Sequence, residues 1–169
     1  MEQHRRTAAV GQRFLTFEVE TEVYAIPILK VKEILGFREI TPLPQTAPSV
    51  VGVVNLRGTI IPVVDLRIRF GLVPEPPAKH TSIVVLDLRL HGEPFLMGVV
   101  VDRVHEVQVI PAEKISKLAG LETRVKARYV DGVAETPAGL RILIDVDRVL
   151  NEDELADLKA APTTQERRP

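Results

Sequence analysis

The sequence predicts an all-β fold in which two small five-stranded barrels pack together. The β-branched residues Val and Ile occur 24 and 12 times among 169 residues, and such side chains pack well on a pleated sheet. They fall in short runs separated by Gly, Pro and charged clusters, which is typical of many short strands. An internal repeat, described below, divides these runs into two similar sets.

Ten runs of apolar residues are predicted to be strands. They cover residues 13–19, 23–28, 31–37, 51–55, 59–65, 82–90, 93–101, 104–109, 128–135 and 140–145. The connections between them are too short for many helical crossovers, so we expect mainly antiparallel sheets.

Helix is expected in only a few places. We predict a turn of helix at 46–51, one or two turns at 111–118, and a terminal helix over 146–150 and 151–159. The run Leu66-Arg67-Ile68-Arg69-Phe70-Gly71 alternates apolar and basic residues, which favours an extended, solvated segment.

Three blocks of sequence recur in the same order. Residues 14–19 correspond to 83–88, residues 25–34 to 98–107, and residues 52–66 to 132–146. We infer a duplication of a five-stranded unit. A flat sheet of five short strands buries little core and exposes its edges, so each unit is expected to curl into a barrel.

Composition excludes several classes of protein. There is no Cys, which removes thiolate nucleophiles and Cys-based metal sites. Net charge is −1 and Trp is absent, which disfavours the alternative of a small β-barrel nucleic-acid-binding protein. No apolar run approaches the length of a membrane span or a signal peptide. We therefore expect a cytoplasmic protein.

No residue pattern predicts catalysis, so we expect a protein that is not an enzyme, with no catalytic residues, no cofactor and no metal. The histidines, His4, His80, His91 and His105, are scattered, and none of the common nucleophile, zinc or phosphate motifs occurs. Asp65 and Asp145 could be read as paired carboxylates. Because they occupy the same place in the two repeats, each at a strand end, capping or turn formation is the favoured role.

Asn55-Leu56-Arg57-Gly58 is the most distinctive short motif. Asn and Gly favour hairpin turns, and Arg57 there is either solvated or held for an ion pair or a protein contact. Strand alternation places Val31 and Glu33 on one face. That face is either a solvated edge or part of a semi-apolar groove.

The run 49–71 around this motif resembles the chemotaxis coupling protein family CheW. So do Ile26-Pro27-Ile28-Leu29-Lys30 with the residues up to Leu35, the loop 41–44, and the runs 97–104 and 142–150. The resemblance spans about residues 13–150. It departs from the family in the Pro-rich linker 73–79 and at the second turn, 134–139, which carries no second Asn-Leu-Arg-Gly motif.

The resemblance implies two SH3-like five-stranded barrels and a non-enzymatic adaptor in two-component signal transduction. Its partners would be the cytoplasmic tip of the hairpin of methyl-accepting chemoreceptors and the regulatory domain of a CheA-type histidine kinase, with self-association in arrays at the inner membrane. By the same resemblance, Val31, Glu33, Arg57 and Val104 would bind the receptor, and an ion pair between Glu33 and Arg57 would shape the groove. Phe37, Ile40 and Thr41 would contact the kinase.

The expected organisation has three parts. Residues 1–12 form an N-terminal tail, 13–150 a CheW-like domain, and 151–169 a C-terminal helix and tail. Within the domain, barrel one covers about 13–72 and barrel two about 80–145, with exchange of segments between the barrels left open.

Overall fold

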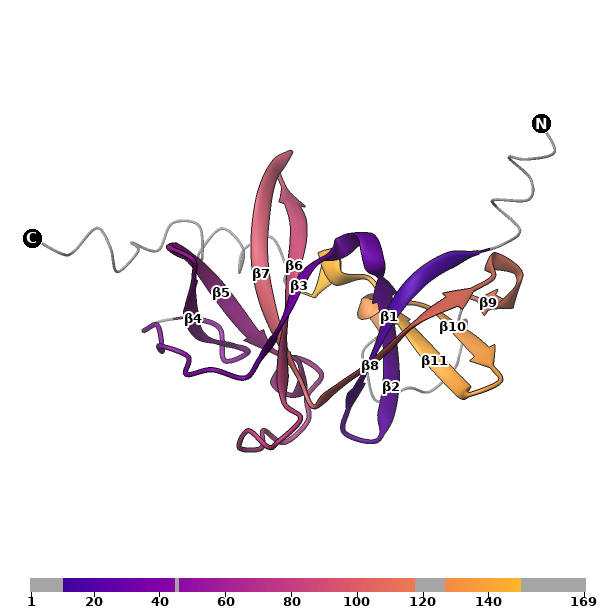
Figure 1. Ribbon diagram of the computed structural model, residues 1–169, viewed down its shortest axis with the longest axis horizontal. Helices are drawn as coiled ribbons and strands as arrows, with labels where there is room; N and C mark the ends of the chain where they lie inside the picture. The colour runs from indigo at the N-terminus through magenta and orange to yellow at the C-terminus, as the bar shows by residue number, and fades with distance from the viewer. Residues whose placement is uncertain (1–10, 45, 118–126, 150–169) are drawn as a thin grey trace, which may run out of the picture.

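The computed structural model describes residues 11–44, 46–117 and 127–149, in which the regular structure is mostly β (Figure 1). The strands are β1 Gln12–Val19, β2 Glu22–Pro27, β3 Val31–Gly36, β4 Val50–Leu56, β5 Thr59–Asp65, β6 Ser82–Leu90, β7 Glu93–Val101, β8 Arg103–Ile110, β9 Ile115–Ser116, β10 Val130–Thr136 and β11 Gly139–Ile144. The helical turns are η1 Ile28–Lys30, α2 Leu66–Arg69, η2 Ala112–Lys114, η3 Ala127–Tyr129 and η4 Val146–Arg148.

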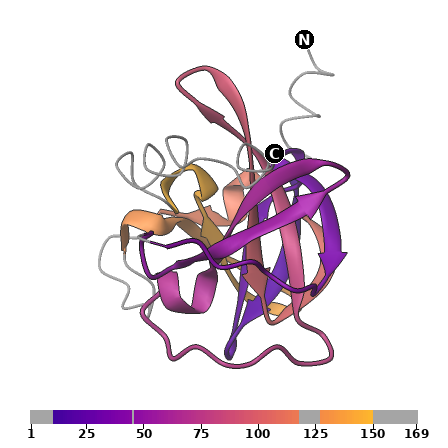
Figure 2. The ribbon, with the colours of Figure 1, turned by 90° about the vertical axis from the view of Figure 1, so that its left-hand side faces the viewer.

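These strands form two sheets that lie side by side along the long axis of the molecule, as Figures 1 and 2 show. A six-stranded sheet has the order β8-β1-β2-β11-β10-β9, and a five-stranded sheet has the order β3-β6-β7-β5-β4. The predicted all-β class with two packed β units is confirmed. The six-stranded sheet contains one strand more than expected, because the two residues of β9 pair with β10.

The two sheets repeat one topology. Replacing each strand by its counterpart in the sequence repeat converts the order β3-β6-β7-β5-β4 into β8-β1-β2-β11-β10. Most neighbours are antiparallel, but β5 runs parallel to β7 and β11 runs parallel to β2. Each sheet therefore combines strands from both halves of the chain. Strands β1 and β2 come from the first half of the chain but belong to the six-stranded sheet, whose other strands come from the second half. Strands β6 and β7 come from the second half but belong to the five-stranded sheet, whose other strands come from the first.

Buried side chains connect the two sheets. The largest cluster draws on both of them, while two smaller clusters lie within one sheet each. The large cluster contains a series of aromatic rings, with centroids of Tyr24 and Phe70 5.1 Å apart and those of Phe70 and Tyr129 6.1 Å apart. Aromatic pairs at such spacings contribute beyond their buried area. The series therefore helps to fix the two sheets against each other.

The prediction of an extended, solvated segment at 66–71 was wrong. Leu66–Arg69 is the short helix α2, and Leu66 and Phe70 are buried. The Asp65 carboxylate accepts a hydrogen bond from the Arg67 backbone amide at 2.8 Å and caps the helix. The i, i+4 spacing then brings Leu66 and Phe70 to one face of the turn.

One smaller expectation also needs correction, a second is confirmed, and a third lies outside the described part. Residues 46, 47, 48 and 49 form no helix, and β4 begins at Val50. The segment 111–118 contains the helical turn η2 but then enters β9. At the C-terminus the described residues show the turn η4 over Val146–Arg148. The helix predicted at 151–159 lies outside the described residues.

Candidate functional site

Glu33 of β3 and Arg57 of the β4–β5 turn form a two-pronged ion pair that connects the two outer strands of the five-stranded sheet. Nη1 of Arg57 donates to Oε1 of Glu33 at 2.6 Å, and Nη2 donates to Oε2 at 2.9 Å. This parallel geometry is the strongest form of an arginine–carboxylate contact. The hydrogen bond from Arg57 is the main cause that lowers the pKa of Glu33, and the contact raises the pKa of Arg57.

The turn that carries Arg57 is built by its neighbours in the motif. Arg57 and Gly58 form the two-residue loop between β4 and β5, and their φ angles are 50° and 86°. Two positive φ angles match the twist of a tight hairpin. Oδ1 of Asn55 accepts a hydrogen bond from the Gly58 amide at 2.8 Å. The arginine is therefore presented from a turn of defined geometry.

The ion pair remains accessible from outside. The Arg57 side chain is 74% exposed, and that of Glu33 is 22% exposed. A guanidinium has five N–H donors, and two of its nitrogens face Glu33. The pair therefore holds the arginine in one direction and leaves much of its surface free to meet a partner.

Val31 is the first residue of β3 and Val104 is the second residue of β8. Strand β3 lies at an edge of the five-stranded sheet, and β8 lies at an edge of the six-stranded sheet. Both valines are half-buried and pack against the central cluster that joins the sheets. A bulge between Val31 and Glu33 interrupts the pairing with β6, so strand alternation alone does not place these two side chains on one face. Of the two cavities described here, neither is lined by Val31, Glu33 or Arg57, and Val104 lines the second.

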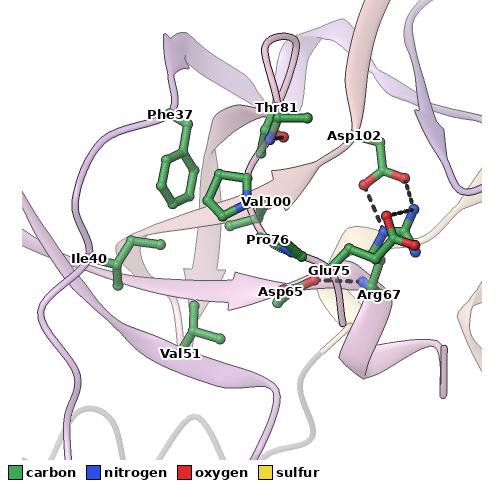
Figure 3. Close-up of a pocket in the computed structure, with 12 residues that line it drawn as sticks. Phe37, Ile40, Val51, Asp65, Arg67, Glu75, Pro76, Thr81, Val100 and Asp102 are labelled. Atoms are coloured by element: carbon green, nitrogen blue, oxygen red, sulfur yellow. Dashed lines mark hydrogen bonds and ion pairs between the residues drawn. The ribbon is translucent and has the colours of Figure 1, made fainter. Parts of the chain in front are cut away.

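Phe37 and Ile40 line the first cavity, called here the linker cavity, with a volume of about 320 Å³. Figure 3 shows these two side chains on one side of it, near Val51 and Val100. Thr41 does not line it. Instead, Thr41 exchanges two backbone hydrogen bonds with Val53, at 2.9 and 2.8 Å. This bridge fixes the loop that follows Phe37 against β4.

The opposite side of the linker cavity is charged (Figure 3). Arg67 donates from Nε and Nη2 to the two carboxylate oxygens of Asp102, at 2.9 and 2.6 Å, and it lies 3.9 Å from Glu75. Burial raises the pKa of Asp65, against the lowering effect of hydrogen bonds from the backbone amides of Arg67 and Ile68. Oδ2 of Asp102 also accepts from the Glu20 amide at 2.6 Å.

Sequence reasoning missed Arg67 and Asp102. Asp102 stands between β7 of one sheet and β8 of the other, so the pair with Arg67 lies where the chain crosses between sheets. The sequence Asp65-Leu66-Arg67 could have indicated the short helix that carries Arg67, because an aspartate at a strand end can cap a following helix. The partner of Arg67 could not be inferred, since it lies 35 residues away.

The described residues contain neither a cluster of metal ligands nor a membrane-spanning helix. No three His, Asp or Glu side chains among them gather closely enough to hold a metal ion. Within the same ranges, no helix combines the length and the apolar character that crossing a membrane requires.

Comparisons with known proteins agree on one family. The model of the CheW-like domain matches residues 13–154. The chain is 34% identical over 147 residues to a chemotaxis protein CheW of Klebsiella aerogenes, covering 87% of this chain and 86% of that protein. It is 30% identical over 138 residues to a chemotaxis protein CheW of Thermotoga maritima, covering 82% and 87%.

A solved structure shows the same likeness in three dimensions. The crystal structure of the scaffolding protein CheW from Thermoanaerobacter tengcongensis superposes with a TM-score of 0.76 at 31% sequence identity. The match covers 85% of this chain and 97% of that one.

Proposed function

This chain belongs to the CheW-like domain family, and we propose on that basis that it couples chemoreceptors to a CheA-type histidine kinase. Members of this family are non-enzymatic scaffold proteins of chemotaxis. In our proposal the chain binds the cytoplasmic tip of the receptor and the regulatory domain of the kinase, and works in the cytoplasm at receptor arrays. Family membership does not favour nucleic-acid binding.

The observation that carries the proposal is the exposed ion pair of Glu33 and Arg57. An amphipathic helix that docks on a protein needs apolar contacts for affinity and fixed charges for register. Val31, two residues before Glu33 on β3, supplies half-buried apolar surface. We assign Val31, Glu33, Arg57 and Val104 to receptor binding.

We assign the kinase contact to Phe37, Ile40 and Thr41. Support comes from the linker cavity, which is lined by the exposed side chain of Phe37 and the half-buried side chain of Ile40. The backbone bridge of Thr41 to Val53 keeps that loop in place. An apolar anchor of the kinase could fill such a hollow without reordering the loop, which lowers the entropic cost of association.

Isothermal titration calorimetry tests both assignments. The full chain is titrated with the kinase regulatory domain and, separately, with a receptor signalling fragment from the same organism. Arg57→Ala is expected to weaken receptor binding by about tenfold or more, since arginines held at interfaces are frequent hot spots. Glu33→Ala is expected to follow, because Arg57 then loses its fixed direction. Kinase binding should stay within about twofold in both variants.

The matched control is Arg89→Ala, which removes an exposed arginine from β6, outside the proposed site. Circular dichroism melts establish that every variant is folded. Equal losses for receptor and kinase would contradict the assignment of the ion pair to the receptor. A folded wild-type chain that binds neither partner would contradict the coupling function itself.

A further inference from the structure

A second cavity, called here the basic hollow, lies beside the linker cavity and has a volume of about 530 Å³. Its walls are Gly36 at the end of β3 with the following Phe37, the segment from Pro77 to Ser82 that leads into β6, and the start of β8 at Arg103 and Val104. In Figure 1 these segments meet where the chain passes from β7 to β8. It therefore lies at the junction of the two sheets.

The hollow gathers two cations, Lys79 and Arg103, beside a histidine. Lys79, His80 and Arg103 line it, and no aspartate or glutamate does. The chain as a whole carries a net charge of −1, so this concentration is local. The linker cavity next to it is different, because Asp65, Glu75 and Asp102 accompany its single arginine.

These basic side chains lack carboxylate partners within the described part of the chain. Arg57, Arg67 and Lys30 each form an ion pair there, with Glu33, Asp102 and Asp147. No ion pair joins Lys79, His80 or Arg103 to any described residue. Charges that the fold leaves unpaired around a hollow can attract and orient a partner of opposite sign.

The backbone holds this basic segment in a defined place. Thr81 Oγ1 accepts a hydrogen bond from the Ala78 amide at 2.8 Å, and the Thr81 amide donates to the Ala78 carbonyl at 3.2 Å. Lys79 and His80 therefore form the tip of a turn. The Phe37 amide donates to the Thr81 carbonyl at 3.2 Å, which ties this turn to the end of β3.

We propose that the basic hollow binds an acidic segment of a protein partner that also carries an apolar side chain. Carboxylates of the segment would meet Lys79, His80 and Arg103. Its apolar side chain would lie against Phe37, which is 36% exposed, and Val104. The proposal rests on the proposed function only in that Phe37 and Val104 are among its assigned contact residues.

A protein segment fits the hollow better than other anions do. Single-stranded nucleic acid is held by stacking on several aromatic rings, and Phe37 is the one Phe, Tyr or Trp side chain among the residues that line the hollow. A small anion needs several donors converging on one point. Here the three basic residues come from two separate segments around an open hollow, a spacing that suits several carboxylates along a chain.

The test is a titration of the full ¹⁵N-labelled chain with the peptide acetyl-Glu-Glu-Leu-Glu-Glu-Leu-amide, followed by NMR. The amide signals of Thr81, Ser82 and Arg103 are expected to shift, and the shifts should shrink as salt is added. The same peptide with Lys in place of each Glu should cause none. If the acidic peptide shifts none of these signals, or both peptides shift them equally, the proposal is overturned.

Charge reversal provides the second measurement. Lys79→Glu combined with Arg103→Glu is expected to weaken peptide binding by about tenfold or more. Arg89→Glu combined with Lys114→Glu changes the net charge equally at exposed sites elsewhere, and it should retain binding. Equal weakening in the two double variants would reduce the effect to net charge and overturn the proposal.

Two further probes separate other ligands. Sodium phosphate that shifts the three amide signals while the peptide does not would reassign the hollow to a small anion and overturn the proposal. Tighter binding of a single-stranded oligonucleotide than of the acidic peptide would also overturn it. None of these titrations uses the kinase or the receptor, so failure here leaves the coupling function untouched, and failure of coupling leaves these results standing.

Discussion

The hairpins β4–β5 and β10–β11 are counterparts in the sequence repeat, yet within the described residues only the first carries an ion pair at its turn. Both contain a register shift at the equivalent place, between Val50 and Gly52 in one and between Val130 and Gly132 in the other. Both end at an aspartate that accepts a hydrogen bond from a backbone amide two residues later. The framework has thus been copied closely.

The turns themselves differ. Arg57 and Gly58 form the first turn, while Pro137 and Ala138 occupy the corresponding positions of the second. There the Thr136 hydroxyl donates to the Gly139 carbonyl at 2.7 Å. Glu106, the counterpart of Glu33, forms no ion pair within the described residues. What the duplication preserves is the scaffold, and the departures from symmetry mark the surface we assign to the receptor.

The largest difference in stability between the two hairpins is expected from alanine substitution of Gly52 and Gly132, the glycines at the two register shifts. Gly52 has a φ of +149°, and a Cβ placed there would lie 2.1 Å from the backbone carbonyl oxygen of Thr41. At Gly132 the nearest atom would be a methyl carbon of Ile115 at 2.9 Å, which can move with its side chain. Gly52→Ala is therefore expected to cost about 3 kcal/mol or more and Gly132→Ala about 1–2 kcal/mol.

Urea unfolding followed by circular dichroism measures both costs. Gly36→Ala is the matched control, because a Cβ at Gly36 would meet nothing within 4 Å. Equal destabilisation at Gly52 and Gly132 would mean that the loop at Thr41 moves aside easily. The close approach of that loop to β4 would then not be a constraint of the first half.

Two ion pairs extend the comparison to the segments where the chain changes sheets. Arg67 of α2 binds Asp102, which precedes β8, and Asp147 of η4 binds Lys30, which precedes β3. Arg67 and Asp147 are counterparts in the repeat, whereas Lys30 corresponds to Arg103, the residue next to Asp102, so the two pairs are similar in place but not equivalent residue by residue. The first pair is better formed, because the Arg67 side chain is only 14% exposed and makes two bonds, whereas Lys30 is 35% exposed and makes one.

Loss of these two cations should therefore have unequal effects. Arg67→Ala leaves Asp102 partly buried without its main partner and is expected to cost about 1–3 kcal/mol. Lys30→Ala removes an exposed pair and should cost less than about 1 kcal/mol. Denaturant midpoints at fixed ionic strength give both values. If Lys30→Ala lowers the free energy of unfolding as much as Arg67→Ala does, burial does not determine which of the two ion pairs contributes more to stability.

Much of the fold could be predicted from the sequence. The strands β5, β6 and β7 begin and end at the residues predicted for them, because apolar runs rich in Val and Ile between turn residues leave few other interpretations. The sequence repeat also predicted two β units of similar structure, and the two sheets share one topology. The exchange of strands could not be predicted, since β3 has the same local pattern whether it pairs within its own half or with β6.

The site was predictable only where a short motif fixes local geometry. Asn55 and Gly58 predict a hairpin turn, which is present. The ion pair between Glu33 and Arg57 expected from the family resemblance is also present. Short runs are ambiguous, which is why 66–71 was misread. Six residues fit both a period of 2 and an i, i+4 pair, and the buried face of Leu66 and Phe70 decides between them only in the folded chain. The basic hollow could not be predicted from the sequence, because it forms only where three segments that are distant along the chain come together.

The smallest expected effect concerns the aspartate that ends the first hairpin. Burial raises the pKa of Asp65, so the carboxylate ionises more readily in the unfolded chain. Ionisation at neutral pH therefore costs the folded state some stability. Asp65→Asn keeps an oxygen that can accept the Arg67 amide and removes the charge. We expect the variant to melt slightly above the wild type at neutral pH.

The sign of the pH dependence makes this prediction sharp. The advantage of Asp65→Asn should shrink as the pH falls through the raised pKa of the folded state. It should vanish below the ordinary pKa of aspartic acid, where Asp65 is protonated in both states. Thermal melts of both proteins across this range measure it. An Asp65→Asn variant less stable than the wild type at neutral pH would show that the negative charge at the start of α2, beside Arg67, outweighs its burial.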